Sequence, residues 1–291
     1  MTYLISHKTT YKYKHPVSIG NHLAYLTPRS QPGQVCDWNE LHIKPTPAMC
    51  SRRTDYFGNS VNVFTIQDPH EKLEIEARSR VMLDGQVSGL PLHSPPWEEV
   101  ARSVPADSSP AGIEAYQFVF ESPRIKTSPE FGEYASQSFA PRLPLAEALL
   151  DLTARIHKDF RFDSKATTVR TPTEEVFRRR RGVCQDFAHL QIACLRSLNL
   201  PARYVSGYLR TYRRPEDQHL TGADASHAWV SVYCPDAGWL DVDPTNNVVP
   251  SQSHVTLAWG RDYGDVSPVR GVIVGGRDHT LEVAVEMRAL E

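Results

Sequence analysis

Apolar and charged residues alternate in the first third of the chain. Leu73, Ile75 and Ala77 are separated by single glutamates, and this period of two predicts a strand with one buried and one solvated face. Shorter alternations of the same kind occur around residues 11–13 and 41–43. We therefore expect the first part of the chain to form an antiparallel, β-rich unit.

The period changes after Pro144. Leu145, Leu149, Leu152 and Ile156 follow one another at steps of 4, 3 and 4, which places them on one stripe of an amphipathic helix. Proline is well tolerated at a helix start, so Pro144 is well placed to begin this helix. The pattern predicts a helix from residue 145 onward.

Two further helices are expected directly after it. Residues 171–174 (TPTE) form a capping-box pattern with proline at the first helical position, and Gly182 is a natural stop. The next apolar stripe begins near Cys184, continues to Leu198 and ends at residues 199–201 (NLP). Cys184 therefore falls at the predicted start of a helix.

Strand patterns resume after the third helix. Residues 202–212, 226–234 and 239–243 predict consecutive strands, and residues 281–287 predict a final one. Helices that lead into an antiparallel sheet are typical of an α+β fold. We expect that class for the second half of the chain.

A proline-rich stretch separates the two patterns. Residues 91–144 contain several chain breakers and predict a connecting region with at most short helices. The length of 291 residues corresponds to about two domains of ~150 residues. We expect a β-rich N-terminal domain with its connector over residues 1–140 and an α+β domain over residues 141–291.

The charge balance narrows the range of partners. The chain carries 32 Lys and Arg against 34 Asp and Glu, a formal net charge of −2, which argues against nucleic acid as the main partner. No apolar run approaches the ~18 residues that a membrane helix needs, so no membrane partner is expected. The first residues lack a secretory signal pattern, and we expect a cytoplasmic protein of unknown oligomeric state.

The five cysteines favour a catalytic thiol over a disulfide framework or a metal site. Their number is odd and no C-x-x-C pair occurs, so neither disulfides nor a cysteine zinc site is expected. No EF-hand loop is present, and we expect no metal and no cofactor. Cys184 lies between a helix-stopping glycine and a new helix, where free N–H groups favour a thiolate. Cys194 and Cys234 are expected to be buried structural residues.

A nucleophilic thiol needs a base and a residue that orients it. His227 opens a strand and is the best candidate for the base, whereas His189 lies five residues after Cys184 and is expected on the helix surface. Asp241 and Asp243 both follow on the next strand. Alternation puts them on one face, so spacing alone does not choose between them.

These residues lie within motifs of a known family. Five segments resemble the bacterial transglutaminase-like family, whose members are described as cysteine proteases. They are residues 182–188 (GVCQDFA), 200–208 (LPARYVSGY), 227–230 (HAWV), 238–239 (GW) and 243–245 (DPT). Further segments resemble the β-rich N-terminal region that accompanies this core, at residues 7–13 (HKTTYKY), 26–29 (LTPR) and 55–59 (DYFGN).

The resemblance implies a papain-like transglutaminase core, with helices packed on an antiparallel sheet and a Cys-His-Asp triad. It carries the catalytic roles to Cys184 and His227, and its D-P-T motif selects Asp243. Animal transglutaminases take an oxyanion donor from an upstream tryptophan, but residues 157–162 (HKDFRF) contain none. The backbone N–H of Cys184 is therefore the one oxyanion donor that we name.

Three further residues are expected in or near the site. Gln185 is expected to line the cleft, and Trp229 to wall the acyl site, although large aromatic residues on strands are more often part of a core. Asp186 in the first helical turn is expected to complement the helix dipole rather than to act in catalysis.

The expected function is a thiol-dependent acyl transfer on peptide or carboxamide bonds, with hydrolysis preferred because water is abundant. Amine crosslinking, as by a protein-glutamine gamma-glutamyltransferase, is the alternative, and a catalytically silent binding module is a third reading. The partner would be a peptide or protein substrate. An acidic substrate is suggested by clustered arginines, which lie at residues 178–181, 203, 210, 213 and 214.

Overall fold

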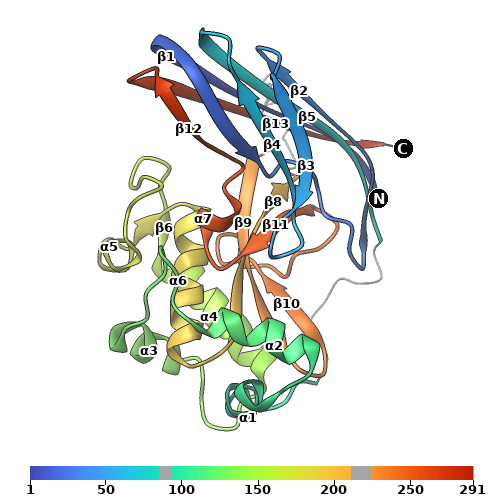
Figure 1. Cartoon of the computed structure of the whole chain (residues 1–291). Helices are drawn as coiled ribbons and strands as arrows, with labels where there is room; N and C mark the ends of the chain where they lie inside the picture. Colours follow the sequence, from blue (N-terminus) through green and yellow to red (C-terminus); the bar gives the residue numbers. More distant parts are fainter. Residues whose placement is uncertain (85–92, 211–224, 291) are drawn as a thin grey trace, which may run out of the picture.

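The structure is a computed structural model that describes residues 1–84, 93–210 and 225–290. A curled β-sheet forms one end of the molecule and a group of helices forms the other, with a smaller sheet between them (Figure 1). The layers place the smaller sheet in contact with both ends.

The curled sheet has seven strands in the order β2-β5-β1-β4-β3, with β12 and β13 also paired to β1. Its strands are β1 (Thr2–Ala24), β2 (Gln34–Lys44), β3 (Met49–Thr54), β4 (Ser60–Ile66), β5 (His70–Leu83), β12 (Val269–Gly275) and β13 (His279–Leu290). The pairs are antiparallel, as predicted. The alternation around Leu73 and Ile75 is confirmed, since both side chains are fully buried in the sheet's own small core.

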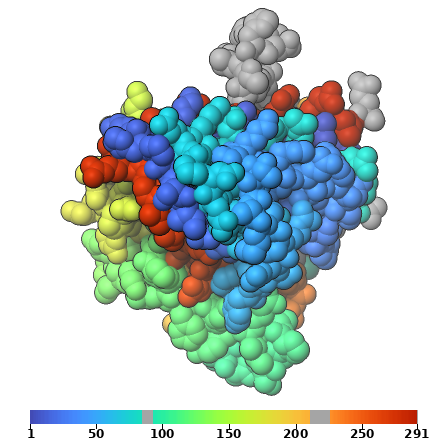
Figure 2. All heavy atoms as spheres, turned by 45° about the horizontal axis from the view of Figure 1, so that its top comes forward, coloured from blue at the N-terminus to red at the C-terminus, as the bar shows by residue number. Residues whose placement is uncertain are grey.

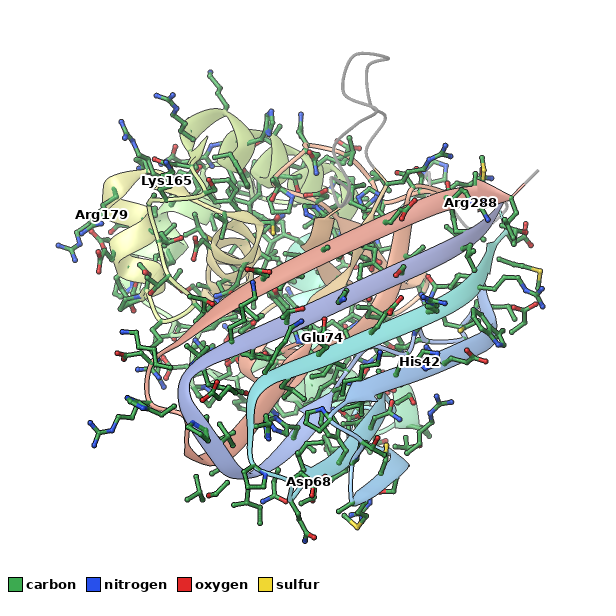
Figure 3. All side chains as sticks on the ribbon, turned by 90° about the horizontal axis from the view of Figure 1, so that it is seen from above. His42, Asp68, Glu74, Lys165, Arg179 and Arg288 are labelled. Atoms are coloured by element: carbon green, nitrogen blue, oxygen red, sulfur yellow. The ribbon has the colours of Figure 1, made fainter. Side chains whose placement is uncertain are left out.

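Both ends of the described chain lie in this sheet. Thr2 pairs with Leu290 and Tyr13 with His279, so the first half of β1 runs beside β13 (Figure 3). C-terminal residues accordingly lie among N-terminal residues on the surface (Figure 2). Residues 269–275 and 279–290 thus belong to the same sheet as the N-terminal strands, and the boundary expected at residue 140 stays a prediction. Sequence periodicity does not reveal which partner a distant strand takes.

The smaller sheet has four antiparallel strands in the order β10-β9-β8-β11. Its strands are β8 (Ala202–Leu209), β9 (Ala225–Cys234), β10 (Gly238–Val242) and β11 (His254–Gly260). The rest of the strand predicted over residues 202–212 lies outside the described residues after Arg210. A short parallel pair joins β6 (Arg161–Phe162) and β7 (Arg181–Gly182).

The helices pack mainly around one central helix, α6. They are α1 (Trp97–Ser103), α2 (Pro110–Tyr116), α3 (Pro129–Ser136), α4 (Leu145–Asp159), α5 (Thr173–Arg179), α6 (Cys184–Ser197) and α7 (Tyr263–Val266), with two 3₁₀ turns, η2 (Val104–Ala106) and η3 (Gln117–Val119). Every residue of α6 from Gln185 to Arg196 is buried. The helices predicted at Leu145 and Cys184 are thus confirmed.

The start of α5 differs from the prediction. The side chain of Thr171 accepts a hydrogen bond from the backbone N–H of Thr168 instead of capping the helix, and Pro172 occupies the cap position. The helix ends at Arg179, because Arg180 has a left-handed backbone (φ 54°), so the chain turns two residues before Gly182. Arg178 and Arg179 thus lie in the helix, but Arg180 and Arg181 do not, although the pattern predicted a helix that runs up to Gly182.

The proline-rich region is more than a connector. It contains the short helices that its breakers allow, but they pack into the main core through Val100, Phe118 and Phe131, which are at most 1% exposed. Aromatic contacts strengthen this packing, for example between Phe118 and Trp239. The region therefore belongs to the helical end of the molecule.

Side-chain amides attach the curled sheet to β11, the edge strand of the smaller sheet. Gln34 accepts from the backbone N–H of Thr256 (2.8 Å) and donates to its carbonyl (2.7 Å). Asn59 does the same for Trp259, at 3.0 and 2.8 Å. Because an amide carries both a donor and an acceptor, each side chain pairs with an edge residue as a further strand would.

Among the residues described, no helix combines the length and apolar character that crossing a membrane requires.

Candidate active site

Cys184 is the first residue of α6 and is partly exposed. The helix starts here because the Asp186 carboxylate accepts a hydrogen bond from the backbone N–H of Val183 (2.8 Å), and Thr167 donates a second one to the same oxygen. Asp186 is 2% exposed, and burial raises its pKa. Its contacts match the structural role expected for it.

Gly182 makes room for this helix start. A Cβ atom at residue 182 would lie 2.7 Å from Oδ2 and 2.8 Å from Cβ of Asp186. Such contacts are too short for a side chain, so only glycine lets the carboxylate reach back to Val183. The position of the Cys184 sulfur therefore depends on the residue two places before it.

His227 connects Cys184 to Asp243. Its side chain is hydrogen-bonded to Cys184, and its Nε2 lies 2.7 Å from Oδ2 of Asp243. Since Nε2 is engaged by the aspartate, Nδ1 is the ring nitrogen left for the sulfur. The structure thus brings together the three residues that the sequence singled out, in the order thiol, imidazole, carboxylate.

The electrostatics of the pair favour a charged imidazole. Burial lowers the pKa of His227, but its hydrogen bonds to Asp243 and Cys184 outweigh burial and raise the pKa to about 10. Burial likewise raises the pKa of Asp243, yet the bonds from His227 and His254 hold it well below its usual range. A fully buried carboxylate is stable here because its neighbours donate to it.

Two residues that the sequence analysis missed complete the environment of Asp243. Asn246 donates from Nδ2 to Oδ2 at 2.6 Å, and its backbone N–H, with that of Thr245, donates to Oδ1. His254 places Nε2 3.3 Å from the same Oδ2. The turn pattern D-P-T-N is a local signal that could have indicated Asn246, but nothing near His254 in the sequence points to it.

His227, Asp243 and His254 also form a cluster with metal-binding atom types. Their three ligand atoms lie within 4.8 Å of one another, and no other such group was found among the described residues. At 2.7 Å, however, His227 and Asp243 are hydrogen-bonded through the atoms that would bind a metal. The cluster as it stands is arranged for sharing a proton.

Asp241 has a different partner. Its Oδ2 accepts a hydrogen bond from Nε1 of Trp229 at 3.0 Å. Strand alternation put Asp241 and Asp243 on one face, and the geometry separates them because only Asp243 reaches His227. Trp229 is 1% exposed and does not line the pocket at Cys184. It packs behind this pocket, and its expected place in the wall of the acyl site stays a prediction.

A pocket of ≈ 230 Å³ opens beside Cys184 and His227. Gln185 lines it, as predicted. One further group of lining residues comes from the core: Tyr204, Ser206, Ser226, Ala228 and Tyr263. A second group comes from the curled sheet and the segment before it: His7, Thr9, Tyr11, Pro268, Val269, Leu281 and Val283. The curled sheet therefore supplies one wall of the pocket.

His189 is buried, which corrects the prediction of a surface position. It is 4% exposed, its Nε2 accepts from the backbone N–H of Tyr263, and burial lowers its pKa to about 3. The apolar stripe suggested one buried face, but the neighbours of α6 cover the whole helix. His189 supports the position of α7 and does not compete with His227.

The remaining cysteines lie away from the pocket. Cys194 and Cys234 are fully buried, as expected, and burial raises the pKa of Cys194 to about 12. Cys36 is partly exposed and Cys50 exposed, both on strands of the curled sheet.

Of the clustered arginines, those that the structure describes do not line the pocket at Cys184. Arg179 points outward from the molecule and pairs with Glu175 (Figure 3), and Arg203 is buried elsewhere, at 6% exposure. Arg213 and Arg214 lie outside the described residues. The acidic substrate inferred from these arginines thus stays a prediction.

Comparison with known proteins agrees with this architecture. Residues 3–82 match the bacterial transglutaminase-like N-terminal region, and residues 133–244 match the transglutaminase-like superfamily. An uncharacterized protein of Mycobacterium tuberculosis, Rv2569c, is 38% identical over 99% of this chain and 93% of its own length. The chain belongs to the bacterial transglutaminase-like family.

Two further proteins are similar to this chain. The fold matches a crystal structure of a "Putative Cysteine Protease" from Cytophaga hutchinsonii, with a TM-score of 0.75 at 21% identity over 100% of this chain and 91% of that one. The expected α+β, papain-like fold is thus confirmed. A protein-glutamine gamma-glutamyltransferase of Pseudomonas aeruginosa is 31% identical over 133 residues, covering 43% of this chain and 20% of that protein.

Proposed function

We propose that the protein is a thiol-dependent acyl-transfer enzyme that hydrolyses peptide or carboxamide bonds. The observation that supports this most directly is the position of His227, hydrogen-bonded to Cys184 on one side and to Asp243 on the other. A protonated imidazole beside a sulfur at a helix N-terminus favours the thiolate, which is the nucleophilic form.

The reaction proceeds in two halves. The Cys184 thiolate attacks the carbonyl carbon, and the tetrahedral intermediate collapses as protonated His227 gives its proton to the leaving amine. This leaves an acyl-thioester and a neutral imidazole. His227 then takes a proton from water, whose oxygen attacks the thioester, and the acid leaves with the thiolate and the imidazolium restored. Asp243 orients His227 and stabilises its charged form.

Tyr204 is our candidate for the second oxyanion donor, beside the backbone N–H of Cys184. Its side chain lines the pocket, and burial followed by the charge of Cys184 raises its pKa well above the usual value. The phenol therefore keeps its proton and can donate it to a developing oxyanion. Changing Tyr204 to Phe should lower kcat by about 10- to 100-fold and leave the fold unchanged.

The pocket lining indicates a neutral substrate side chain. Among the described residues that line it, none is Lys, Arg, Asp or Glu, whereas Leu281 and Val283 are apolar. Apart from the Cys184–His227 pair, which the reaction uses, an ionised substrate side chain would lose its hydration there without gaining an ionic partner. The described lining residues likewise include no carboxylate to receive a lysine amine, which favours hydrolysis over crosslinking.

Amine transfer is the second candidate, because a relative whose match covers 43% of this chain is a protein-glutamine gamma-glutamyltransferase. One assay separates the candidates. Peptides with neutral, acidic or basic side chains and free glutamine amides are incubated with enzyme and a fluorescent primary amine, with Cys184→Ala as the control.

We expect new amine ends or ammonia from neutral substrates, without incorporation of the fluorescent amine. Incorporation that exceeds hydrolysis would instead show a transferase. A wild-type protein as inactive as Cys184→Ala across the panel would contradict both and favour a binding module.

A further inference from the structure

A second pocket, of ≈ 490 Å³, lies on the opposite face of the four-stranded sheet from Cys184. Successive strand residues point to opposite faces, so Tyr204 and Ala228 line the first pocket while their neighbours Arg203 and Trp229 line the second. Nothing in the proposed reaction uses this second space.

Arg203 is the unusual feature of this pocket. Its side chain is 94% buried, and its guanidinium lies between the rings of Trp239 (3.9 Å) and Trp259 (3.7 Å). None of the described carboxylates lies within ion-pair distance of it, and its Nε has no hydrogen-bond partner among the described residues. Asp241 and Glu114 act on this charge electrostatically, but neither forms an ion pair with it. A buried charge that no carboxylate contacts directly is costly, so this guanidinium is positioned to bind an anion.

Asp241 stands on the same face of the sheet. It pairs with Ser231 on β9, and Ser231 pairs with Arg203 on β8, so the two charged side chains are two strands apart with a serine between them. One oxygen of Asp241 accepts from Trp229. The carboxylate also lines the pocket, so it can accept from a ligand there.

The charges around the pocket select the kind of anion. Asp84 and Glu114 line it as well, so a phosphate or another multiply charged anion would be repelled. A ligand with a single carboxylate and a neighbouring positive group is attracted at both ends, because the carboxylate faces Arg203 and the positive group faces Asp241. Three indole rings, those of Trp229, Trp239 and Trp259, add apolar walls.

We propose that this pocket binds a free α-amino acid with an apolar side chain. The guanidinium of Arg203 takes the carboxylate, Asp241 takes the ammonium group, and the side chain packs against the tryptophans. Arginine suits this role because its planar fork binds a carboxylate through two parallel hydrogen bonds.

Tryptophan fluorescence provides a readout that does not depend on enzyme activity. The chain has five tryptophans, and three line this pocket. L-Leucine, which does not fluoresce, should give a saturable change when titrated into the full-length protein. L-Leucinamide lacks the carboxylate and 4-methylpentanoate lacks the ammonium group, so each should bind about tenfold more weakly or worse.

Matched variants assign the effect to the pocket. Arg203→Lys keeps the charge but loses the fork, and should weaken leucine binding about tenfold, as should Asp241→Asn. Arg29 is the control, because it stacks on the same Trp259 at 3.4 Å but bonds to Phe57 and Asn59 and does not line the pocket. Arg29→Lys should bind leucine like the wild type.

Three results would overturn the proposal: no saturable change with leucine, equal affinity for leucine and both analogues, or wild-type affinity in Asp241→Asn. Circular dichroism will show whether Arg203→Lys folds. If it does not, the two analogues and Asp241→Asn still show whether the pocket binds leucine through its carboxylate and ammonium groups.

Discussion

The two pockets lie on opposite faces of one four-stranded sheet and differ in almost every property. The pocket at Cys184 is small and, outside the Cys184–His227 pair, has no Lys, Arg, Asp or Glu among its described lining residues, whereas the one at Arg203 is about twice as large and is rimmed by charges and indole rings. Both nevertheless reach Asp243. His227 borders the first and His254 the second, and each contacts the same carboxylate oxygen.

The difference arises because each of two strands, β8 and β9, contributes side chains to both pockets. On β8, Arg203 and Tyr204 are adjacent in sequence but face opposite pockets, and on β9 the same holds for Ala228 and Trp229. Because side chains alternate with a period of two, a change at one residue can alter one pocket and leave the other nearly intact. The aspartates of the D-x-D-P segment separate the two functions most cleanly.

The first and largest expected effect tests that separation. Asp243→Asn should lower turnover by about 10⁴-fold with the fold intact, because it leaves His227 in the wrong tautomer. Asp241→Asn should change turnover by less than a few-fold, since Asp241 contacts Trp229. Steady-state rates and circular dichroism of both variants measure these effects. A larger loss of turnover in Asp241→Asn would show that Asp241, and not Asp243, orients His227.

Thiol reactivity tests the pocket at Cys184 by itself. Iodoacetamide reacts with the thiolate form, and an imidazolium beside a sulfur at a helix N-terminus stabilises that form. Iodoacetamide should therefore label Cys184 about tenfold faster than the exposed Cys50, and His227→Ala should remove this preference. Peptide mapping after brief labelling measures both rates. Preferential labelling of Cys50 or Cys36 would show that Cys184 is not activated.

The shared contact at Asp243 also predicts how stability depends on pH. His227 has a pKa of about 10 in the folded protein, against about 6.5 when unfolded. The stabilisation from its charged form is therefore complete below pH 6.5 and is lost as the pH rises toward 10, because only the folded protein keeps the proton in this range.

Urea unfolding at pH 6 and at pH 9.5 measures this dependence. The wild type should exceed His227→Gln in free energy of unfolding by clearly more at pH 6 than at pH 9.5. Asp241→Asn serves as the control and should follow the wild type. An equal difference at both values would mean that His227 is neutral in the folded protein.

The smallest expected effect concerns the wall that both pockets share. The curled sheet lines the first pocket through His7 and the second through Gln34, and Asn59 helps to attach it. Asn59→Ala should lower the free energy of unfolding by about 1–3 kcal/mol, because it leaves buried groups of Trp259 unpaired.

The matched control is Asn21→Ala. Asn21 is an exposed residue of the same sheet, and its loss should cost at most about 0.5 kcal/mol. Chemical denaturation of both variants gives the comparison. Equal losses would show that the amide contacts to β11 contribute no special stability.

Local signals in the sequence were sufficient for the elements that carry the candidate triad. The helix start at Cys184 and the helix after Pro144 are determined by caps and periodicity within a few residues, and both were predicted. The roles of His227 and Asp243 followed from family motifs, because alternation alone left Asp241 equally suitable. The geometry then separated the two aspartates.

Features that depend on distant partners were not predictable in this way. The burial of His189 comes from neighbours on every side of α6, and the pairing of β13 with β1 joins residues more than 260 positions apart. His254 reaches Asp243 only through the order of strands in the sheet. Single-sequence periodicity gives the type of an element but carries no information about these partners.

The pairing of β1 with β13 also has a consequence for biosynthesis. Leu281 and Val283, which line the pocket at Cys184, belong to a segment that is made after Cys184, His227 and Asp243. Until β13 has left the ribosome and paired with β1, that side of the pocket is open to solvent. A nascent chain would thus carry its thiol, imidazole and carboxylate well before it can hold a substrate against them.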